Sequence, residues 1–402
     1  MLRPSVEWEL AGTLVQLTKA GRTIRLMGAG TKAQIGPHLD ADVTMTLTDM
    51  RGITRFEPAE QIMSAKAGTP VRDIERELSR YDLMLPFEPV DLGPIFGREP
   101  RIGTIGAVFA TNLSGSRRIA AGSAADHLIG ATVVTGQGDI LDLGGLHAQA
   151  ARHPDLLAAL SGSWGTLGAI TQVAFSVVPQ DSEMATVVLT GLLEDVAVAA
   201  MADALAADCG VTGAVHIDAD LAGRFTTPVL ERGARATVVR LEGPAAVFAG
   251  RLSRVLQCLA VYGQCDVVDD RDSAGLWSEI QGLSPFQSTE LPVWRLVVPP
   301  SRAGEVLRDI RRYFPCSAML DWAGGLIWLE TLPSSDAGAP DIRRVLANLG
   351  GYATLVRADE EVRGAVDCFQ PLDVHVDRLA RRVKSVFDPR QIFNPGRSHA
   401  GY

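Results

Sequence analysis

The sequence predicts an α+β protein built from two domains and a C-terminal segment that returns to the first. Residues 1–180 combine short strands with glycine-rich loops, and residues 181–370 alternate strands and helices regularly. Residues 371–402 read as a helix followed by a proline-containing turn. Glycine loops become rare beyond Pro179, and this shift in composition places the domain boundary near residue 180. The chain has 402 residues, enough for two domains with substantial cores.

The first elements are predicted to be a helix and a strand. Residues 5–20 repeat apolar side chains at helical spacing, and Gly21 ends the helix. A short strand at residues 23–27 leads directly into Gly28-Ala29-Gly30-Thr31-Lys32. Its G-x-G-x-x-A spacing resembles a Rossmann fingerprint, but Gly36-Pro37 leaves no room for the long helix that such a site needs. We therefore expect a second strand at residues 43–47, and a loop whose N–H groups can bind a diphosphate.

A helix is expected after Gly68, with Thr69 as its N-cap and Pro70 in its first turn. It follows a strand pair at residues 53–56 and 61–67 and precedes a proline-rich loop at 87–100.

The centre of the first domain is the run 101–139, which is rich in glycine and small residues. Small side chains let a bulky ligand lie against the backbone, and glycine permits turns that aim N–H groups at phosphate oxygens. Thr104 is expected to cap a helix over 105–112, whose N-terminus would offer free N–H donors. Strands at 128–135, 140–143 and 169–178, a helix at 154–161 and a tight glycine loop at 162–168 complete the domain. The run predicts one wall of a nucleotide-cofactor site, against the alternative of a surface loop.

The second domain reads as two similar α+β units. Strands at 185–189, 211–217 and 236–241 with helices at 194–208 and 244–260 form the first unit. Strands at 293–298, 317–321, 325–330 and 352–356 with helices at 302–313 and 341–348 form the second. Two such units are typical of a duplicated ferredoxin-like split βαβ arrangement. The stretch 266–291 is predicted to be a link that contains a helix around 276–280.

The tail begins at Pro371 with a helix that places Val376, Leu379, Val383 and Val386/Phe387 on one face. A fixed turn follows at 387–397, because it contains two prolines and a glycine.

Composition excludes several classes of protein. The net charge of −9 argues against a nucleic-acid partner. The five cysteines form no C-x-x-C pair, so they predict reduced thiols in a cytoplasmic protein and no metal site. Glu7 and Glu9 stand where a signal peptide needs an apolar core, and no apolar run reaches the length of a membrane span.

Several blocks of the chain resemble the flavin-dependent oxidase family typified by vanillyl-alcohol oxidase. Within this family the blocks look most like the FAD-binding subunits of bacterial glycolate oxidase. The blocks are GAGTK at 28–32, AGTPVRDIERELSRYDLMLPFEP at 67–89, IGTIGAVFATNLSGSRR at 102–118, GSAADHLIGATVVTGQGDILDLGG at 122–145, SWGTLGAITQV at 163–173 and FDPRQIFNPGR at 387–397.

The resemblance implies a PCMH-type FAD-binding domain (1–180), an α+β cap (181–370) and a returning tail (371–402). It implies that FAD is bound by Gly28, Ala29, Gly30, Thr31, Lys32, Leu85, Pro86, Gly103, Thr104, Gly106, Ala107, Thr111, Gly115, Ser116, Arg117, Gly122, Ser123, Gly168, Ile170 and Asn394. Residues 28–32 contain no His or Cys for a covalent bond, so it implies non-covalent FAD. The implied activity is oxidation of small 2-hydroxy acids, with electrons passing to a second FAD-containing subunit and an iron–sulfur subunit. Location is then cytoplasmic, with contact to the inner membrane through these partners left open.

The chain departs from the glycolate oxidase pattern before the second glycine loop. Gln149 and His153-Pro154-Asp155 stand where those subunits have a Lys and a Gly-Tyr-Asp. A cation and a phenol near the flavin are therefore missing, and the catalytic residues stay unassigned.

Other candidates remain open from the sequence. His216 and His375 are possible bases, although a single strand histidine is more often structural. Arg117-Arg118 could neutralise a phosphate or a carboxylate, or be a solvated pair, and Trp322 and Trp328 favour core or interface positions over substrate stacking. A stand-alone FAD oxidase of another hydroxy acid or alcohol, and a non-catalytic flavin or scaffold subunit, are the alternative functions.

Overall fold

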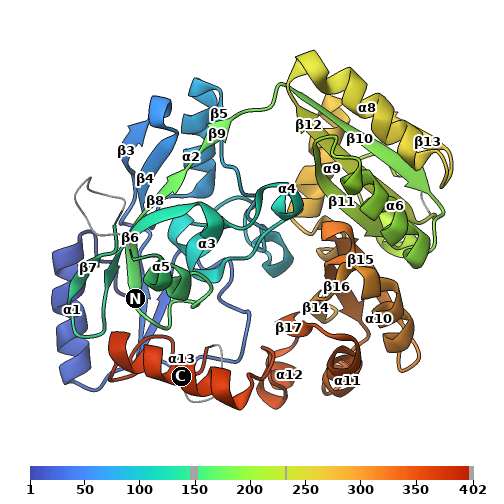
Figure 1. Ribbon diagram of the computed structural model, residues 1–402. Helices are drawn as coiled ribbons and strands as arrows, with labels where there is room; N and C mark the ends of the chain where they lie inside the picture. The colour runs from blue at the N-terminus through green and yellow to red at the C-terminus, as the bar shows by residue number, and fades with distance from the viewer. Residues whose placement is uncertain (145–152, 231–232, 398–402) are drawn as a thin grey trace.

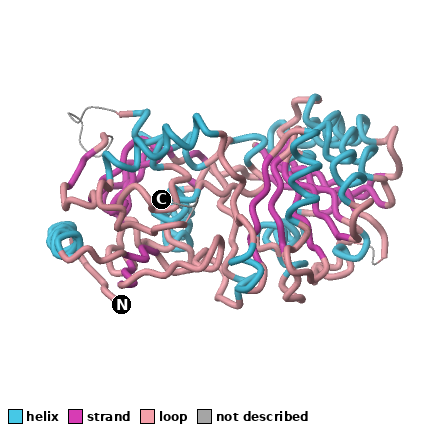
Figure 2. The backbone as a smooth tube through the Cα atoms, turned by 90° about the horizontal axis from the view of Figure 1, so that it is seen from below, coloured by secondary structure: helices cyan, strands magenta, loops and turns pink. Residues whose placement is uncertain are grey.

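The computed structural model describes residues 1–144, 153–230 and 233–397. Most of its strands fall into two large sheets that occupy separate halves of the molecule (Figures 1 and 2). The first large sheet draws all its strands from residues 53–176, and the second from residues 183–357.

The N-terminal half is organised by a five-stranded antiparallel sheet in the order β3-β4-β8-β6-β7. The strands are β3 (Ile53–Glu57), β4 (Ile62–Lys66), β6 (Leu128–Val134), β7 (Ile140–Asp142) and β8 (Ala169–Ser176). Around them lie α1 (Glu7–Lys19), α2 (Val71–Leu78), α3 (Ile105–Thr111), α4 (Arg118–Ala121), α5 (Pro154–Leu160) and the short pair β5 (Leu83–Met84) and β9 (Val178–Pro179). Helix α3 packs on this sheet through Ile105, Val108 and Phe109, which are buried.

The strand–loop–strand prediction at the N-terminus is confirmed. Strand β1 (Ile24–Met27) pairs in parallel with β2 (Val43–Thr46), and the described residues between them form turns and no helix. The Rossmann alternative therefore does not apply.

The second half is one eight-stranded antiparallel sheet with the order β13-β10-β12-β11-β15-β16-β14-β17. Its first unit runs β10 (Glu183–Thr190), α6 (Glu194–Ala206), β11 (Val211–Ile217), β12 (Ala236–Gly243), α8 (Ala245–Leu259) and β13 (Cys265–Val268). Its second runs β14 (Val293–Val297), α10 (Ala303–Ile310), β15 (Cys316–Asp321), β16 (Leu326–Thr331), α11 (Ala339–Leu349) and β17 (Tyr352–Arg357). The short α7 (Ala219–Ala222) and α9 (Asp270–Gln281) lie outside these β-α-β-β-α-β repeats, and α12 (Glu360–Ala365) follows them.

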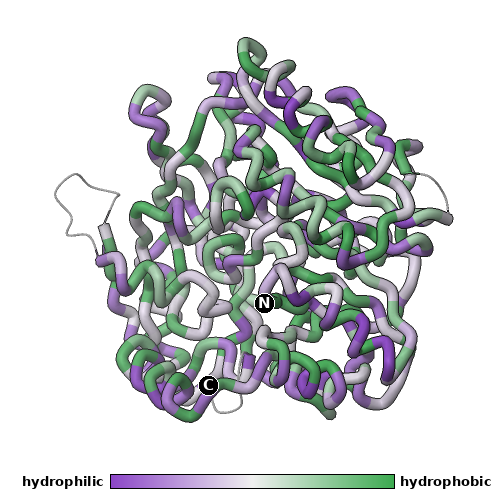
Figure 3. Tube along the Cα trace, turned by 45° about the vertical axis from the view of Figure 1, so that its right-hand side comes forward, coloured by the Kyte–Doolittle hydropathy of each residue, from purple (hydrophilic) through white to green (hydrophobic). Residues whose placement is uncertain are grey.

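Both units have the strand order of the ferredoxin-like motif, with the fourth strand beside the first and the third between first and second. The two units join edge to edge, where β11 pairs with β15 through His216 opposite Leu320 and Ile217 opposite Met319. One face of the sheet carries α6, α8, α10 and α11, and the other packs on the N-terminal half through Ile35, Leu92 and Ile95. Hydrophobic and hydrophilic residues alternate along the outer helices, as expected for helices with one buried side (Figure 3).

Two predictions for this half need correction. The stretch 266–291 is more than a link, because it begins within β13, the fourth strand of the first unit. The helix in this stretch is also longer than predicted, since α9 spans Asp270–Gln281.

The C-terminal helix α13 (Val374–Phe387) returns to the N-terminal half, as the lower part of Figure 1 shows. The predicted apolar face is buried only in part: Phe387 is buried and Val383 packs against the core of the N-terminal half, but Val376, Leu379 and Val386 are exposed by half or more. The helix is anchored by Phe387 and by Lys384, whose ammonium donates to Asp388 Oδ2 at 2.7 Å and to the Phe393 carbonyl at 3.1 Å. None of the described helices is long and apolar enough to cross a lipid bilayer.

Candidate functional site

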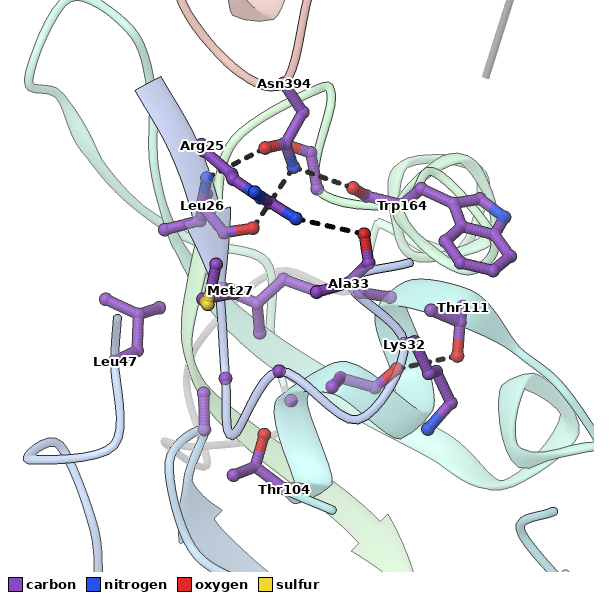
Figure 4. Close-up of a pocket in the computed structure, with 18 of the residues that line it drawn as sticks. Arg25, Leu26, Met27, Lys32, Ala33, Leu47, Thr104, Thr111, Trp164 and Asn394 are labelled. Carbon is purple, nitrogen blue, oxygen red and sulfur yellow. Dashed lines mark hydrogen bonds between the residues drawn. The ribbon is translucent and has the colours of Figure 1, made fainter. Parts of the chain in front are cut away.

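Three loops and the tail converge on one cavity in the N-terminal half, which we call the glycine-loop cavity (Figure 4). Its wall is formed by residues from 25–33, 104–111 and 164–170, together with Asn394 and Arg397. The segments are far apart in sequence, and the packing of β1, α3 and β8 brings them together. The arrangement joins the glycine loops that the sequence singled out.

Asn394 holds this arrangement together. Its Oδ1 accepts a hydrogen bond from the Leu26 N–H at 2.8 Å, and its Nδ2 donates to the Trp164 carbonyl at 2.9 Å (Figure 4). One amide side chain therefore ties the tail to both β1 and the loop that precedes β8. Asn394 itself adopts a left-handed φ of 42°, which Asn tolerates better than most residues.

The glycines of the wall allow very close packing. A Cβ on Gly28 would lie 2.2 Å from Thr104 Oγ1, and one on Gly106 would lie 2.5 Å from the Ala67 Cβ. Gly30 has a φ of +77°, which side chains rarely adopt. The 28–33 loop can therefore turn sharply beside the N-terminal end of α3.

Thr104 does not cap α3 as predicted. It occupies the N-cap position with an extended backbone, but its hydroxyl makes no side-chain cap hydrogen bond. The hydroxyl is buried and has no hydrogen-bond partner among the described residues, although Thr104 lines the cavity (Figure 4). An unsatisfied buried hydroxyl is costly, so this group is a free contact for a ligand.

The Thr69 cap is also wrong. Helix α2 begins at Val71 with Pro70 in the N-cap position. The Thr69 hydroxyl donates instead to the Lys66 carbonyl at 2.6 Å and accepts from the Gly52 N–H at 2.9 Å. The hydroxyl therefore links the end of β4 to the loop that precedes β3.

Positive charge accumulates around the glycine-loop cavity. Arg25 and Arg397 both donate to the Ala33 carbonyl, at 3.1 and 3.0 Å, and Lys32 lines the wall beside them. Burial lowers the pKa of Lys32 to about 8, an effect that Asp91 opposes. Burial, with Arg25 and Arg363 nearby, lowers the pKa of Arg397 to about 9. No Asp or Glu lines this cavity within the described ranges, so an anion would relieve the repulsion.

Eleven of the residues implied by the resemblance line this cavity: Gly28, Gly30, Thr31, Lys32, Thr104, Gly106, Ala107, Thr111, Gly168, Ile170 and Asn394. Ala29 and Gly103 are chain neighbours of lining residues but are not part of its wall. The others lie elsewhere: Leu85, Pro86, Gly115, Ser116, Arg117, Gly122 and Ser123.

The outlying residues have structural contacts of their own. Arg117 and Leu85 line a separate hollow between the two halves, where Arg117 pairs with Glu242 at 2.7 Å. Ser116 donates to Asp321 at 2.8 Å, and Ser123 forms a capping box with Asp126.

Sequence reasoning missed Arg25, Trp164 and Arg397. Arg25 and Arg397 lie outside a glycine motif or at its edge and Trp164 lies within the 162–168 loop, but only the fold places the three side chains together. Arg397 lies over the Trp164 ring at 5.4 Å, which fixes both side chains at the rim.

The candidate bases lie away from this cavity. His216 is fully buried in the cap sheet, where its Nδ1 lies 2.9 Å from Thr237 Oγ1, and burial lowers its pKa to about 4. His153 and His375 are exposed at the starts of α5 and α13. Gln149 lies outside the described residues, and within the described ranges no group of three or more His, Cys, Asp or Glu is arranged to hold a metal ion.

Comparison with known proteins gives the site a context. Residues 1–144 match the family model described as an FAD binding domain, and this stretch carries most of the cavity wall. In this stretch and beyond it the chain is similar to FAD-linked oxidases. It is 28% identical over 377 residues to the glycolate oxidase subunit GlcE of Escherichia coli K12, covering 93% of this chain and 92% of that one.

Two further proteins are similar to this chain over nearly its whole length. A D-lactate dehydrogenase of Archaeoglobus fulgidus is 23% identical over 415 residues, covering 99% of this chain and 90% of that one. The structure of p-cresol methylhydroxylase with substrate bound superposes with a TM-score of 0.71 at 13% identity, covering 99% of this chain and 88% of that chain. The α+β PCMH-type fold is therefore established, and the FAD-binding domain indicates FAD as cofactor.

Proposed function

We propose that this chain is the FAD-binding subunit of a glycolate-oxidase-like 2-hydroxyacid dehydrogenase and that it holds FAD non-covalently in the glycine-loop cavity. The observation that carries the cofactor assignment is the cavity itself, in which cations without a carboxylate among the described lining residues, a buried hydroxyl without a described partner and three glycine loops meet. The similarity to the glycolate oxidase subunit over nearly the whole chain supports the reaction class.

Different residues of the cavity would bind different parts of FAD. Lys32, Arg25 and Arg397 supply charge for the diphosphate, and the N–H groups of the 28–33 loop can donate to its oxygens. Thr104 offers its free hydroxyl. The apolar side chains of Leu26, Leu47 and Ile170 would exclude water from the bound cofactor. No His or Cys among the described residues lines the cavity, which supports non-covalent attachment.

When bound, FAD supplies a hydride acceptor for oxidation of a CH–OH group. The electrons would leave through a second FAD-containing subunit and an iron–sulfur subunit. The similarity to a protein named as a glycolate oxidase subunit supports a role within such a complex. The base that removes the hydroxyl proton stays unassigned. His153-Pro154 in place of the glycolate oxidase pattern keeps a flavin-binding scaffold subunit as the second candidate.

Absorption spectroscopy of the purified chain tests the proposal. We expect flavin bands near a 1:1 ratio to protein, and acid precipitation should release all the flavin into the supernatant. Anaerobic addition of 2-hydroxy acids should bleach the flavin in the presence of partner subunits. Bleaching of the isolated chain would indicate a self-sufficient oxidase, and a reconstituted complex that never bleaches this flavin would indicate a scaffold role. A chain that cannot be loaded with flavin contradicts the proposal.

A further inference from the structure

A second cavity opens beside the glycine-loop cavity, between the loop after α3 and the cap sheet. Its volume is about 750 Å³, and we call it the arginine cavity after Arg118 and Arg295 in its wall. Thr111 and Trp164 line both cavities, so the two adjoin. A group bound in the arginine cavity therefore lies next to the cofactor proposed above.

Arg295 is the unusual residue of this cavity. It lies on β14, opposite Trp328 of β16 and Thr354 of β17, on the sheet face that meets the N-terminal half. Its side chain is 7% exposed and its Nε has no hydrogen-bond partner within the described ranges. Burial lowers the pKa of Arg295, and the adjacent Tyr352 opposes this shift. A buried guanidinium with an open donor is costly unless a ligand completes it.

The guanidinium of Arg118, from the N-terminal half, reaches the same side of the arginine cavity as Arg295. Arg118 and Arg295 lie over the Trp322 ring at 5.0 and 5.2 Å from its centroid. Neither arginine is within ion-pair distance of a described carboxylate, although the charge of Asp321 raises the pKa of Arg295 and the charge of Arg118 lowers the pKa of Asp126. No Asp or Glu of the described chain lines this cavity.

Trp322 is held firmly as a platform for both. Its indole N–H donates to the Gly115 carbonyl at 2.9 Å, and its backbone N–H donates to Asp321 at 2.6 Å. Trp322 and Ala323 both adopt left-handed φ angles of 55° and 53°, a strained pair that persists only where the surroundings hold it. The sequence favours a core or interface position for Trp322, and the structure packs it against a buried core cluster while it also lines the cavity wall.

The rest of the wall is mainly apolar. Val297, Val298, Leu113, Ile119, Phe369 and Trp164 face a space far larger than a two- or three-carbon acid fills. Cavities of roughly 300–1,000 Å³ typically enclose organic ligands of drug size.

We propose that the arginine cavity binds the substrate as a carboxylate anion, held between Arg295 and Arg118, and that the substrate carries an apolar or aromatic substituent much larger than that of glycolate or lactate. The inference rests on the proposed function, because the flavin must occupy the adjoining cavity for this acid to be oxidised. Arg295 then orients the carboxylate, and the apolar wall selects the substituent.

Binding of non-oxidisable analogues to the flavin-loaded chain tests this without turnover. The probes are 3-phenylpropionate, acetate and 3-phenylpropionamide, followed by the flavin difference spectrum and by tryptophan fluorescence. We expect 3-phenylpropionate to bind at least about tenfold more tightly than either of the others, because only it has both the charge and the ring. Equal affinity for acetate and 3-phenylpropionate would overturn the size inference, and equal affinity for the amide would overturn the anion site.

Variants localise the site. Arg295→Met should weaken 3-phenylpropionate binding about tenfold or more, and Arg295→Lys should restore part of it. Arg118→Met, at an exposed position, covers the case in which the Arg295 variants fail to fold. Arg308→Met on α10 is the matched control, since Arg308 pairs with Asp195 on the outside of the cap and should leave binding unchanged. Unaltered binding in both Arg118→Met and a folded Arg295 variant contradicts the proposal.

Flavin content, measured in every sample, separates a failure of the arginine cavity from a failure of the proposed function. A yellow protein that does not bind the anion refutes the arginine cavity alone. A protein that never retains flavin refutes the proposed function.

Discussion

Arg117 and Arg118 are neighbours in sequence but belong to two very different clusters at the junction of the two halves. Arg117 joins Arg240, Glu88 and Glu242 in what we call the paired cluster, where each charge has a counter-ion within 4.0 Å. Arg118 joins Arg295 and Trp322 in the open cluster, which lines the arginine cavity without a carboxylate of the described chain.

The difference separates a structural contact from a ligand site. Burial opposes the ionisation of Glu242, but Arg240 and Arg117 outweigh it and hold its pKa below the usual value. The paired cluster is thus electrically complete and joins the two halves of the chain. The open cluster has an excess of positive charge at a cavity, and charge of that kind is retained where an anion binds.

The largest expected effect comes from breaking the paired cluster. Arg240 is almost fully buried, donates to Glu88 at 2.8 Å and to Thr212 at 3.0 Å, and lies over Trp277. Arg240→Met removes a cation from the buried Glu242 and from the nearly buried Glu88, and we expect the free energy of unfolding to fall by about 3–5 kcal/mol. Urea denaturation followed by circular dichroism measures this, with Arg308→Met as a surface control expected to lose less than about 1 kcal/mol. Equal losses in the two variants would contradict the role of the paired cluster.

The sequence predicted the repeat of the cap but could not foresee these clusters. Alternating strands and helices reveal both β-α-β-β-α units, because their buried positions are periodic. Strand β13 was missed because it is a four-residue edge strand with no fully buried side chain. The apolar spacing of α13 was misleading, since the helix is held by Lys384 and Asp388 and leaves Leu379 exposed.

The candidate site was likewise predictable only where local sequence patterns determine the structure. Glycine motifs identified the loops of the glycine-loop cavity, because glycine has a conformational role that can be read locally. Among the described residues, the Thr104 hydroxyl and the Arg295 Nε have no hydrogen-bond partner and Arg118 has no ion-pair partner. This depends on which residues the fold brings within reach, and no local pattern encodes it.

The pH dependence of stability sharpens the comparison at Asp321, which lies between the clusters. Burial raises the pKa of Asp321 to about 7, and the nearby charge of Glu88 acts in the same direction. Hydrogen bonds from the Trp322 N–H and Ser116 and the charge of Arg240 lower this pKa but do not outweigh burial. Between pH 4 and 7 the unfolded chain releases this proton and the folded chain keeps it. The free energy of unfolding should therefore fall as pH rises through this window and level off above pH 7.

Asp321→Asn removes this contribution. Relative to the variant, the natural chain should lose roughly 2–3 kcal/mol between pH 5 and pH 7.5. Urea denaturation at the two pH values measures the difference, and parallel curves for the two proteins would show that Asp321 does not titrate there.

A smaller effect is expected in the glycine-loop cavity, where Arg397 is also unpaired with any described carboxylate lining the wall. Arg397→Met should raise the dissociation constant for FAD about tenfold, because one charge facing the diphosphate is lost. Titration of the apo-protein with FAD, followed by quenching of flavin fluorescence, measures this. Arg363→Met, which removes a neighbouring cation outside the cavity wall, should have a distinctly smaller effect.

The smallest expected change in stability is at Arg118 itself. Its side chain is exposed and pairs with no described carboxylate, so Arg118→Met should alter the free energy of unfolding by less than about 0.5 kcal/mol. Arg117→Met, one residue earlier, removes one of the two cations that pair with Glu242 and should cost about 1–3 kcal/mol. The order should reverse for anion binding, where Arg118→Met weakens 3-phenylpropionate and Arg117→Met leaves it nearly unchanged. If both substitutions affected stability and binding alike, the paired and open clusters would be one electrostatic unit, and the division between structural contact and ligand site would be lost.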